Sequence, residues 1–585
     1  MRIRWFVRTV AVLSVAGMVA AACSSKTPVV TQSSAATGTP NIGGKLVLAE
    51  EQWPECLNPV NQCASASVLG YVSTENVMPR AMLWGLDGKP VASPLLTETP
   101  SLDNGDLTAN PFTIHYKINP AAVWSDGTAI TCDDFAFTRN AIINTKGTYG
   151  TAGYTPAPGL AGITNIDCTD EHTAVLAFSA AYTDWPDLFG GGSGGFILEK
   201  AAFPKENASD KVDLGSEMVD TIPFSGGPWK MEQFTQQQAV LVPNDKYWVK
   251  HNGHVTYFDQ VTIVPRTDQS AELADFLSGA IGGIYPQPDV ALVAQFKKDA
   301  NVQYRGDPGN FYESLWFNLS KPPFDDPVVR QAMYWATDRD KVLQNIITPL
   351  DPTQKSPLGC GIFSFPGGYW CDKTPFAQYH YDVNMVSQIM TAGGYAKDSK
   401  GFWAKNGTEV SFVYKTTQKP RRIATQALLK EEMVAAGFNV TTQALDATLL
   451  FETQLPRGNF QIADFAEGGT PDPSPTGTFG CDFIPTAANS YSGANDFHWC
   501  DKAADALMKQ SDSELDPAKR RDLLDQVYAL EAQDYAPGIP LYVLPNLTAW
   551  RKDKVAGPVG KWNPTVYGGF FNMDEWYCPT AGGCG

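Results

Sequence analysis

Apolar and polar residues alternate along Phe112–Lys117, a pattern that predicts a β-strand with one buried face. Short strands are also predicted at Lys45–Ala49, Val261–Val264 and Glu409–Val413. Each is only four to six residues long, which suits strands rather than helices.

Helices are predicted between these strands, because apolar residues recur there at helical spacing. Asp133-Asp134, Asp268, Asp326-Pro327 and Asp516-Pro517 precede such stretches, and an Asp followed by Pro is typical of a helix start. A further helix is predicted over 420–436 with Gly437 at its end. Strands that alternate with helices indicate the α/β class.

The net charge of the chain argues against one class of function. The 585 residues carry 44 Lys and Arg against 62 Asp and Glu, a formal net charge of −18. A nucleic-acid partner is therefore not expected, because a basic face is needed to neutralise phosphates. The length suggests about three to four domains, and 43% hydrophobic residues are enough to bury a core.

The first residues predict export. Arg2, Arg4 and Arg8 precede the uncharged stretch Thr9–Ala22, which as a helix would span about 21 Å, less than the roughly 30 Å bilayer core. We therefore predict a signal peptide over 1–22. Small residues before Cys23 are similar to a lipobox, in which Cys23 is lipidated; plain secretion after cleavage at an A-x-A site is the alternative.

Residues 23–42 are rich in Ser, Thr, Pro and Ala and are expected to be a flexible tether. The protein would then sit on the outer face of the cytoplasmic membrane, attached to it only through the lipid.

Ten further cysteines favour disulfides, because an even number in an exported chain is typical of them. Pairing between sequence neighbours would join 56–63, 132–168, 360–371, 481–500 and 578–584. A zinc site is the rival interpretation, but no C-x-x-C occurs.

Motifs for catalysis or metal binding are weak. Gly191–Gly195 fits G-x-S-x-G only by its glycine content, and the residues before it suit a loop. His251 and His254 lie in turn-like sequence, and acidic pairs such as Asp133-Asp134 are interpreted as helix caps. We expect neither an enzyme, a resident metal nor a cofactor, which leaves a binding protein.

One segment carries a specific resemblance. Trp124–Phe135 reads W-S-D-G-T-A-I-T-C-D-D-F and closely resembles the signature of family 5 extracellular solute-binding proteins, the oligopeptide- and dipeptide-binding subunits of ABC importers. Further similar segments follow in order, and the resemblance spans about 43–576. They are Gly226–Lys230, Asn244–Trp248, Phe317-Asn318, Pro322–Ala332, Ala336–Arg339 and Tyr381–Tyr395.

The resemblance implies a two-lobed, three-domain fold of the periplasmic-binding-protein type II, with a hinge and a ligand cleft between the lobes. Lobe I would combine 43–81, 201–310 and 541–576. An additional domain, domain II, would be 82–200, lobe II 311–540, and the C-terminal tail 577–585. The proposed disulfides would then lie within domains and leave the hinge free.

Site residues implied by the resemblance come from both lobes. In peptide-binding relatives an Asp three residues before an Asp-Pro or Glu-Pro pair takes the ligand ammonium. Here the pair is Asp472-Pro473, and Gly469 stands at that position. Glu467, Asp464 or Asp472 could substitute from shifted positions.

Gln418-Lys419-Pro420 matches the pattern that supplies a basic residue for the ligand carboxylate, with Arg421-Arg422 adjacent. A solvated helix start is the alternative role for Lys419. The remaining expected contacts are Glu51, Gln52, Trp53, Phe465 and Ala466; Trp53 is interpreted either as a lid or as core.

The resemblance therefore implies a monomeric, lipid-anchored protein that delivers oligopeptides or dipeptides to ABC permease subunits with a cytoplasmic ATPase. The missing carboxylate at Gly469 makes a capped, modified or non-peptide ligand the alternative, such as a sugar, a metal chelate or a haem-like molecule. A non-transport role at the cell surface is the third hypothesis.

Overall fold

The computed structural model describes residues 30–31, 40–60, 70–85, 89–145, 159–190, 195–206, 211–358, 374–447, 449–468, 474–489, 491, 493–559, 567–580 and 584. Several predictions fall outside these residues: the signal peptide, Cys23, most of the tether, Gly191–Gly194, Cys63, Cys360, Cys371, Gly469 and Asp472.

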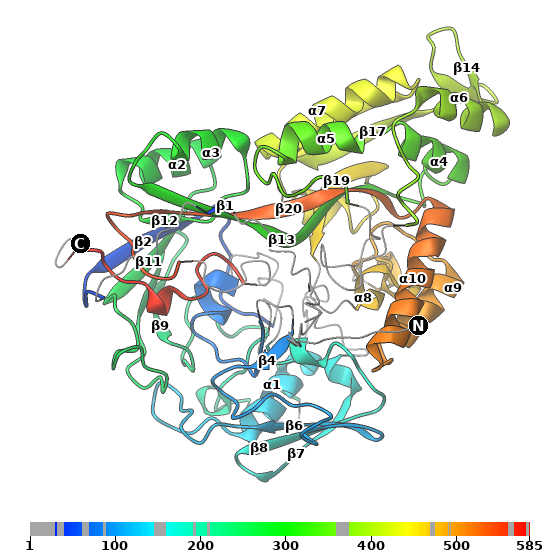
Figure 1. Ribbon diagram of the computed structural model, residues 1–585. Helices are drawn as coiled ribbons and strands as arrows, with labels where there is room; N and C mark the ends of the chain where they lie inside the picture. Colours follow the sequence, from blue (N-terminus) through cyan, green and yellow to red (C-terminus); the bar gives the residue numbers. More distant parts are fainter. Residues whose placement is uncertain are drawn as a thin grey trace, which may run out of the picture.

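One mixed sheet extends through both halves of the molecule (Figure 1). Lobe I, domain II and lobe II are used below as labels for the residue ranges predicted from the sequence. Its strand order is β18-β17-β19-β13-β20-β12-β2-β11-β10-β9, and β1 (Val30–Thr31) pairs with β13 at the side. The centre is formed by the two longest strands, β13 (Val302–Phe317) and β20 (Gly538–Arg551), which pair antiparallel over most of their length. Because β13 and β20 take part in both halves, they connect lobe I to lobe II.

Lobe I contributes one half of this sheet. Its elements are η2 (Gly70–Thr74), β2 (Lys45–Glu50), β9 (Trp229–Phe234), β10 (Ala239–Pro243), β11 (Gln260–Pro265), α2 (Gln269–Ser278), β12 (Gly283–Ile284) and α3 (Val290–Phe296). Strand β2 runs parallel to β11 and β12. The strands predicted at Lys45–Ala49 and Val261–Val264 are confirmed.

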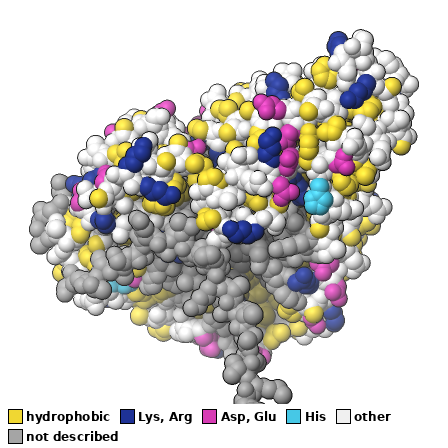
Figure 2. Space-filling view, turned by 45° about the horizontal axis from the view of Figure 1, so that its top comes forward, with side chains coloured by type: hydrophobic (Ala, Val, Ile, Leu, Met, Phe, Trp, Pro, Cys, Tyr) yellow, Lys and Arg dark blue, Asp and Glu magenta, His cyan; other side chains and the backbone are white. Residues whose placement is uncertain are grey.

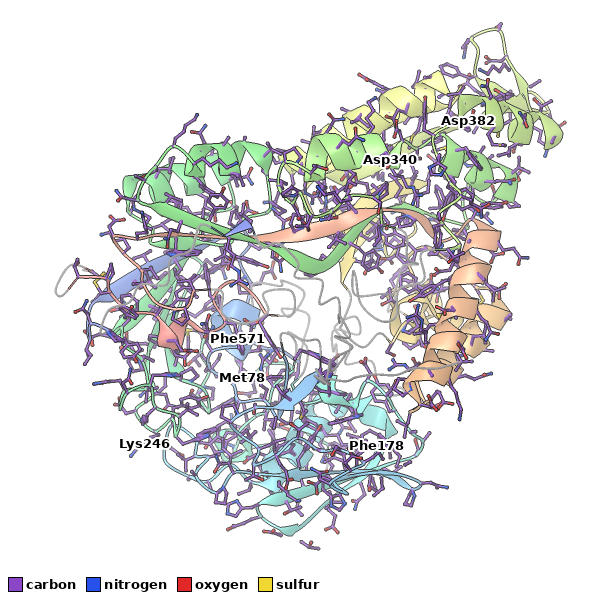
Figure 3. The ribbon with its side chains drawn as sticks, viewed as in Figure 1. Met78, Phe178, Lys246, Asp340, Asp382 and Phe571 are labelled. Atoms are coloured by element: carbon purple, nitrogen blue, oxygen red, sulfur yellow. A yellow bond between two sulfur atoms is a disulfide. The ribbon has the colours of Figure 1, made fainter. Side chains whose placement is uncertain are left out.

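Domain II contains the four-stranded sheet β5-β6-β8-β7 and one long helix. Its elements are β3 (Met82–Trp84), β4 (Pro90–Ala92), β5 (Leu107–Ala109), β6 (Phe112–Lys117), α1 (Cys132–Asn144), η3 (Leu160–Gly162), β7 (Ile163–Asp170), β8 (Thr173–Phe178), η4 (Trp185–Asp187) and η5 (Lys200–Ala202). Phe178, at the end of β8, packs in the hydrophobic core that domain II shares with lobe I (Figure 3). The strand predicted at Phe112–Lys117 is confirmed.

Lobe II carries the other half of the large sheet. Its strands are β14 (Ala396–Lys397), β15 (Trp403–Lys405), β16 (Thr408–Glu409), β17 (Ser411–Thr417), β18 (Asn439–Leu445) and β19 (Ile462–Gly468). Its helices are α4 (Pro327–Trp335), α5 (Arg339–Val342), η6 (Leu343–Ile347), α6 (Val383–Ala392), α7 (Pro420–Ala435), η7 (Leu449–Gln454), α8 (Thr476–Phe479), η8 (Cys481–Phe483), η9 (Ala487–Asn489), α9 (Lys502–Ser511) and α10 (Pro517–Asp534). The 3-10 turn η10 (Met573–Glu575) follows β20.

Aspartates begin most of the helices, as predicted. Asp268, Asp326 and Asp516 each accept backbone N–H groups in the first turn, and Asp382 caps α6 in the outer part of lobe II (Figure 3). The caps satisfy N–H groups that would otherwise have no partner. Gly437 has a φ of 100° just after α7, which suits a glycine.

Two predicted boundaries were wrong. Helix α1 is capped by Thr131, and Asp134 instead accepts the Thr131 N–H in a capping box. The strand predicted at Glu409–Val413 is two strands, because Glu409 pairs with β15 in the small sheet β14-β15-β16 whereas Ser411 begins β17. Val410 between them donates its N–H to the Trp403 carbonyl, so the chain changes sheets there.

Three predicted disulfides are confirmed: Cys132–Cys168, Cys481–Cys500 and Cys578–Cys584. Cys56 is also disulfide-bonded. The first of these bonds joins residues of domain II, and the second joins residues of lobe II.

The main hydrophobic cores lie mostly within one lobe, but Leu515 of lobe II packs against the lobe I core and Leu350 joins a fourth cluster with residues of lobe I. One core runs through lobe I and domain II and includes Leu48, Trp124 and Trp229. Two others cover opposite faces of the lobe II half-sheet, and they include Met333 and Trp316 respectively. Each half is therefore stabilised mainly by its own apolar contacts.

Charged side chains of both signs are interspersed on the face that α2, α3, α5 and α7 cover (Figure 2). Lys341 in α5 pairs with Glu432 in α7 on this side at 3.1 Å. Within the described residues, no helix combines the length and apolar character needed to cross a bilayer.

The pairing of β13 with β20 is interrupted between Pro308 and Tyr312, where Gly309 approaches the other strand closely. A Cβ at Gly309 would lie 1.9 Å from the Leu544 carbonyl oxygen, so we expect Gly309→Ala to push the strands apart and to destabilise the fold by about 2 kcal/mol or more. Thermal unfolding of the purified variant measures this effect. Gly306→Ala in the same strand is the control, because its nearest atom is 3.9 Å away; equal melting temperatures for both variants would contradict the prediction.

Candidate ligand-binding site

The predicted site residues lie where parallel strands end. In lobe II, β17 runs parallel to β18 and to the start of β19; Lys419 follows β17, and Glu467 is near the end of β19. In lobe I, Glu50 ends β2 and Glu51 follows it. Ligands of α/β proteins bind outside the carboxyl ends of parallel strands, so these positions mark the candidate site.

An ion pair joins the two lobes at this place. Lys419 Nζ of lobe II lies 2.9 Å from Glu51 Oε2 of lobe I. The Glu51 side chain is only 6% exposed, and its Oε2 also accepts the Gln287 backbone N–H at 3.1 Å. Two residues predicted from sequence as ligand contacts are thus in contact with each other.

Lobe II also meets domain II. The backbone N–H of Thr183 donates to the Asp512 carbonyl oxygen at 2.8 Å, and the Thr183 hydroxyl donates to the same oxygen at 3.1 Å. Lobe II and domain II are therefore in direct contact, in addition to the Lys419–Glu51 ion pair between lobe II and lobe I.

Buried carboxyl groups surround Glu51. Glu272 on α2 is fully buried, and within the described residues neither of its carboxyl oxygens has a hydrogen-bond partner. Burial, reinforced by the charge of Glu51, raises the pKa of Glu272 to about 9. Burial and the neighbouring carboxylates also raise the pKa of Glu50. At neutral pH the Glu272 carboxyl therefore holds a proton, which limits the repulsion around Glu51.

A buried network fixes the start of α7, where Lys419 is the N-cap residue. Arg422 Nε lies 2.6 Å from Glu313 Oε1, and Arg421 Nη1 lies 3.1 Å from Glu313 Oε2. Arg421 also donates to the Tyr542 hydroxyl. Since Glu313 lies on β13 and Tyr542 on β20, this network attaches α7 to the two connecting strands. The structure thus places Arg421 in the core of lobe II, with 4% of its surface exposed.

The ionised groups of this network sum to a net positive charge. Burial alone would raise the pKa of Glu313, but Arg421 and Arg422 outweigh it and hold the pKa well below its usual range. Burial and the Glu313 charge raise the pKa of Asp464, whose oxygen accepts from Tyr414 at 2.8 Å. Glu313 is therefore the ionised carboxylate of this network, and it faces two guanidinium groups. Asp464, an alternative ammonium contact from sequence, is engaged in this network.

Glu467 lies on the opposite face of β19 from Asp464, because side chains alternate along a strand. It is opposite Tyr312 of β13. In the described part of the chain, its carboxyl group has no hydrogen bond or ion pair with another residue. The residue is partly exposed, yet desolvation raises the pKa of its carboxyl to about 8.

Asp496 lies near enough to Glu467 for the charge of Glu467 to act on it. Its Oδ1 is buried, and no described residue hydrogen-bonds to it. Burial, together with the charge of Glu467, raises the pKa of Asp496. Two neighbouring carboxyl groups with raised pKa values and no basic partner among the described residues form a place where a cation from outside the chain would be stabilised. We call Glu467 and Asp496 the acid pair.

Aromatic side chains pack around Phe465 and fix the backbone of β19 next to Glu467. Phe465 is buried, and its ring packs 5.8 Å from Trp316 and 6.2 Å from Phe497. Trp316 Nε1 donates to the Phe465 carbonyl at 2.9 Å. Phe465 therefore supports the site from the core, while Ala466 on the other face is half-buried.

The residues after Glu51 lie on the surface of lobe I. Gln52 is exposed. Trp53 is half-buried, stacks on Phe234 at 5.7 Å and donates its indole N–H to the Thr235 carbonyl at 2.9 Å. The structure thus attaches Trp53 to the turn after β9.

Two residues of this site were missed from sequence. Asp496 follows a turn in a segment with no motif, and Glu272 sits on an ordinary amphipathic helix. Only the fold brings Asp496 near Glu467 and Glu272 near Glu51, so nothing in the local sequence could have identified them.

No group of three or more His, Cys, Asp and Glu side chains in the described residues is arranged to hold a metal ion. His251 and His254 pair through their backbones, and His251 Nε2 lies 2.7 Å from Asp574.

Known proteins share this architecture. The sequence profile of the bacterial extracellular solute-binding proteins, family 5, matches residues 92–488. The oligopeptide-binding protein OppA of Mycobacterium tuberculosis is 26% identical over 502 residues, which cover 83% of this chain and 77% of OppA.

Solved structures agree with this match. The periplasmic EDTA-binding protein EppA has a TM-score of 0.78 at 20% identity, covering 93% of this chain and 98% of EppA. AppA of Bacillus subtilis, solved with a nonapeptide, has a TM-score of 0.72 at 21% identity, covering 93% of this chain and all of AppA.

The chain belongs to the family 5 bacterial extracellular solute-binding proteins, and it has their two-lobed α/β fold. It is a substrate-binding protein of an ABC importer. The predicted family and fold class are confirmed.

The buried Glu272 carboxyl makes stability depend on pH. Its pKa is raised from 4.5 to about 9, so its stabilising contribution is complete below pH 4.5 and is lost as the pH rises towards 9. We expect Glu272→Gln to gain at least about 1 kcal/mol of unfolding free energy relative to the wild type between pH 5 and pH 9. Urea unfolding at pH 5, 7 and 9 measures this change.

Glu232→Gln, at an exposed position of β9, is the matched control and should differ from the wild type equally at all three pH values. A pH-independent difference for Glu272→Gln would contradict the raised pKa.

Proposed function

We propose that this protein captures peptides with a free amino group between lobe I and lobe II and delivers them to an ABC permease. The acid pair is the observation that carries this proposal. A ligand ammonium between two desolvated carboxyl groups would supply the positive charge that the described chain does not provide there, and charge-assisted hydrogen bonds of this kind are strong.

The backbone beside the acid pair supports an extended ligand. Strand β17 pairs with β19 only at Ile462 and Ala463, so within the described residues no strand accompanies Phe465–Gly468 on that side. A peptide can add to such an edge through backbone hydrogen bonds, which do not depend on its side chains. Its first residue would then place its ammonium close to Glu467.

A non-peptide ligand is the alternative, and one structural neighbour is an EDTA-binding protein. An EDTA complex presents several carboxylates. Such an anion would find no basic partner at Glu467 and Asp496 among the described residues, and it could not supply the positive charge that favours their ionised form. The acid pair therefore favours a peptide over an anionic chelate.

Closure between the lobes would enclose the ligand. Hydrophobic cores that lie mostly on one side of β13 and β20 support treating lobe I with domain II, and lobe II, as two bodies. We propose that the hinge lies at the interruption of strand pairing between Pro308 and Tyr312. The Lys419–Glu51 and Thr183–Asp512 contacts would form on closing.

Calorimetry with a free-amine peptide tests the proposal. Native mass spectrometry of the purified protein first identifies a bound peptide, which is then synthesised. Glu467→Gln is expected to weaken binding of this peptide by about 1–3 kcal/mol, the range for a charge-assisted contact, and Asp496→Asn is expected to act in the same direction. Glu55→Gln, an exposed change in lobe I, is the control.

Binding should also release protons at pH 7. The pKa of Glu467 is about 8 before a ligand arrives, and a bound ammonium favours the ionised form. Titrations in buffers of different ionisation enthalpy count these protons, and Glu467→Gln should reduce the count. A single non-peptide mass in native spectra, or an unchanged affinity in both variants, would refute the proposal.

We further propose that a lipid on Cys23 holds the monomeric protein on the outer face of the cytoplasmic membrane. The small residues before Cys23 and the polar tether after it support this location. Cys23→Ser should move the protein from the membrane fraction to the medium or periplasm, as fractionation with an immunoblot measures. Retention of the variant in washed membranes would contradict the anchor.

A further inference from the structure

The start of α7 is a place that attracts an anion. Helix α7 has 16 residues, and the N-terminus of a helix carries a partial positive charge. Lys419 caps this end, and Arg421 and Arg422 lie in the first turn with only one firm carboxylate, Glu313, between them. The resemblance to relatives predicted a ligand carboxylate at Lys419.

The structure shows a carboxylate of the protein itself at this position. Glu51 of lobe I reaches Lys419 Nζ at 2.9 Å. The Gln287 backbone N–H holds the same Glu51 oxygen at 3.1 Å, so the carboxylate is oriented by its own lobe and not only by Lys419. The Glu51 side chain is 6% exposed and the Lys419 side chain 25% exposed, so water screens the pair only partly.

We propose that Glu51 takes the place of a ligand carboxylate at Lys419, and that the protein therefore selects peptides whose C-terminal end carries no free carboxylate there. This inference rests on the proposed function. A second carboxylate at Lys419 would have to lie beside Glu51, and a single ammonium is a point charge that does not pair two anions as a guanidinium fork can. Amidated, cyclic or otherwise blocked peptides avoid this repulsion.

The other charges of the site agree with a cationic guest. The acid pair has no basic partner among the described residues, and Glu272 is buried close to Glu51 without a hydrogen-bond partner there. Adding a ligand carboxylate would increase the negative charge of this region, whereas a blocked peptide brings only its ammonium. Because Glu51 occupies Lys419, only the amino end of a peptide is recognised by its charge.

A competition between matched peptides tests this inference. One pool contains tripeptides to pentapeptides with free C-terminal carboxylates, and the other contains the same peptides amidated; all have a free amino end. Native mass spectrometry of ligand-stripped protein with equal amounts of both pools gives the ratio of bound amide to bound acid. We expect the wild type to favour the amidated pool by about threefold or more, a difference of about 0.6 kcal/mol.

Variants then assign the preference to the ion pair. Glu51→Gln leaves Lys419 without its carboxylate and should shift the ratio about tenfold towards the acid pool, which corresponds to about 1.4 kcal/mol. Adding Lys419→Met to Glu51→Gln should cancel that shift. Glu55→Gln, a nearby exposed change, should leave the wild-type ratio as it is.

The outcomes separate this inference from the proposed function. A wild-type preference for the acid pool that Lys419→Met removes would overturn the inference and leave peptide binding intact. If the wild type binds neither pool, the proposed function fails and the inference fails with it. Near-UV circular dichroism verifies that the variants are folded. If Glu51→Gln is not folded, the ratio of bound amide to bound acid in the wild type still tests the inference.

Discussion

The antiparallel pairing of β13 with β20 is the constraint on which the rest of the structure depends. These strands lie at the centre of the large sheet, with β12 and β2 on the lobe I side and β19 and β17 on the lobe II side. Every site element is therefore positioned relative to the same two strands. The interruption at Pro308–Tyr312 allows their two halves to differ in direction without breaking the sheet.

Charge pairing across the lobes follows from this geometry. Glu313 on β13 and Tyr542 on β20 hold Arg421 and Arg422, and so they set the position of Lys419 at the start of α7. Lys419 then meets Glu51 at the end of β2. In contrast, the acid pair at the end of β19 has no such partner among the described residues. One charged centre is satisfied within the protein, and we propose that the other binds a ligand ammonium.

Much of this fold could be predicted from sequence, because local rules determine it. Asp326 and Asp516 before prolines marked helix starts, alternation marked β6, and short apolar segments marked β2 and β11. Glu409 was placed in the wrong strand because alternation continues through Val410, although the chain changes sheets there. Tertiary pairing, not local pattern, decides such a boundary.

The site was less predictable for the same reason. Lys419 and Glu51 were identified separately through the resemblance, but their contact joins residues 368 positions apart. Arg421 looked like a ligand contact because it adjoins Lys419, yet helical geometry turns it towards Glu313 in the core. Asp496 had no signal at all, since the role that we propose for it depends on burial and on the neighbouring Glu467, which only the fold provides.

A crystal structure of the protein with its bound ligand tests the central claim most directly. The account predicts a ligand nitrogen about 3 Å from a carboxylate oxygen of Glu467 or Asp496, with Lys419 still paired with Glu51. A ligand carboxylate on Lys419, with Glu51 displaced and no cation near the acid pair, would contradict it.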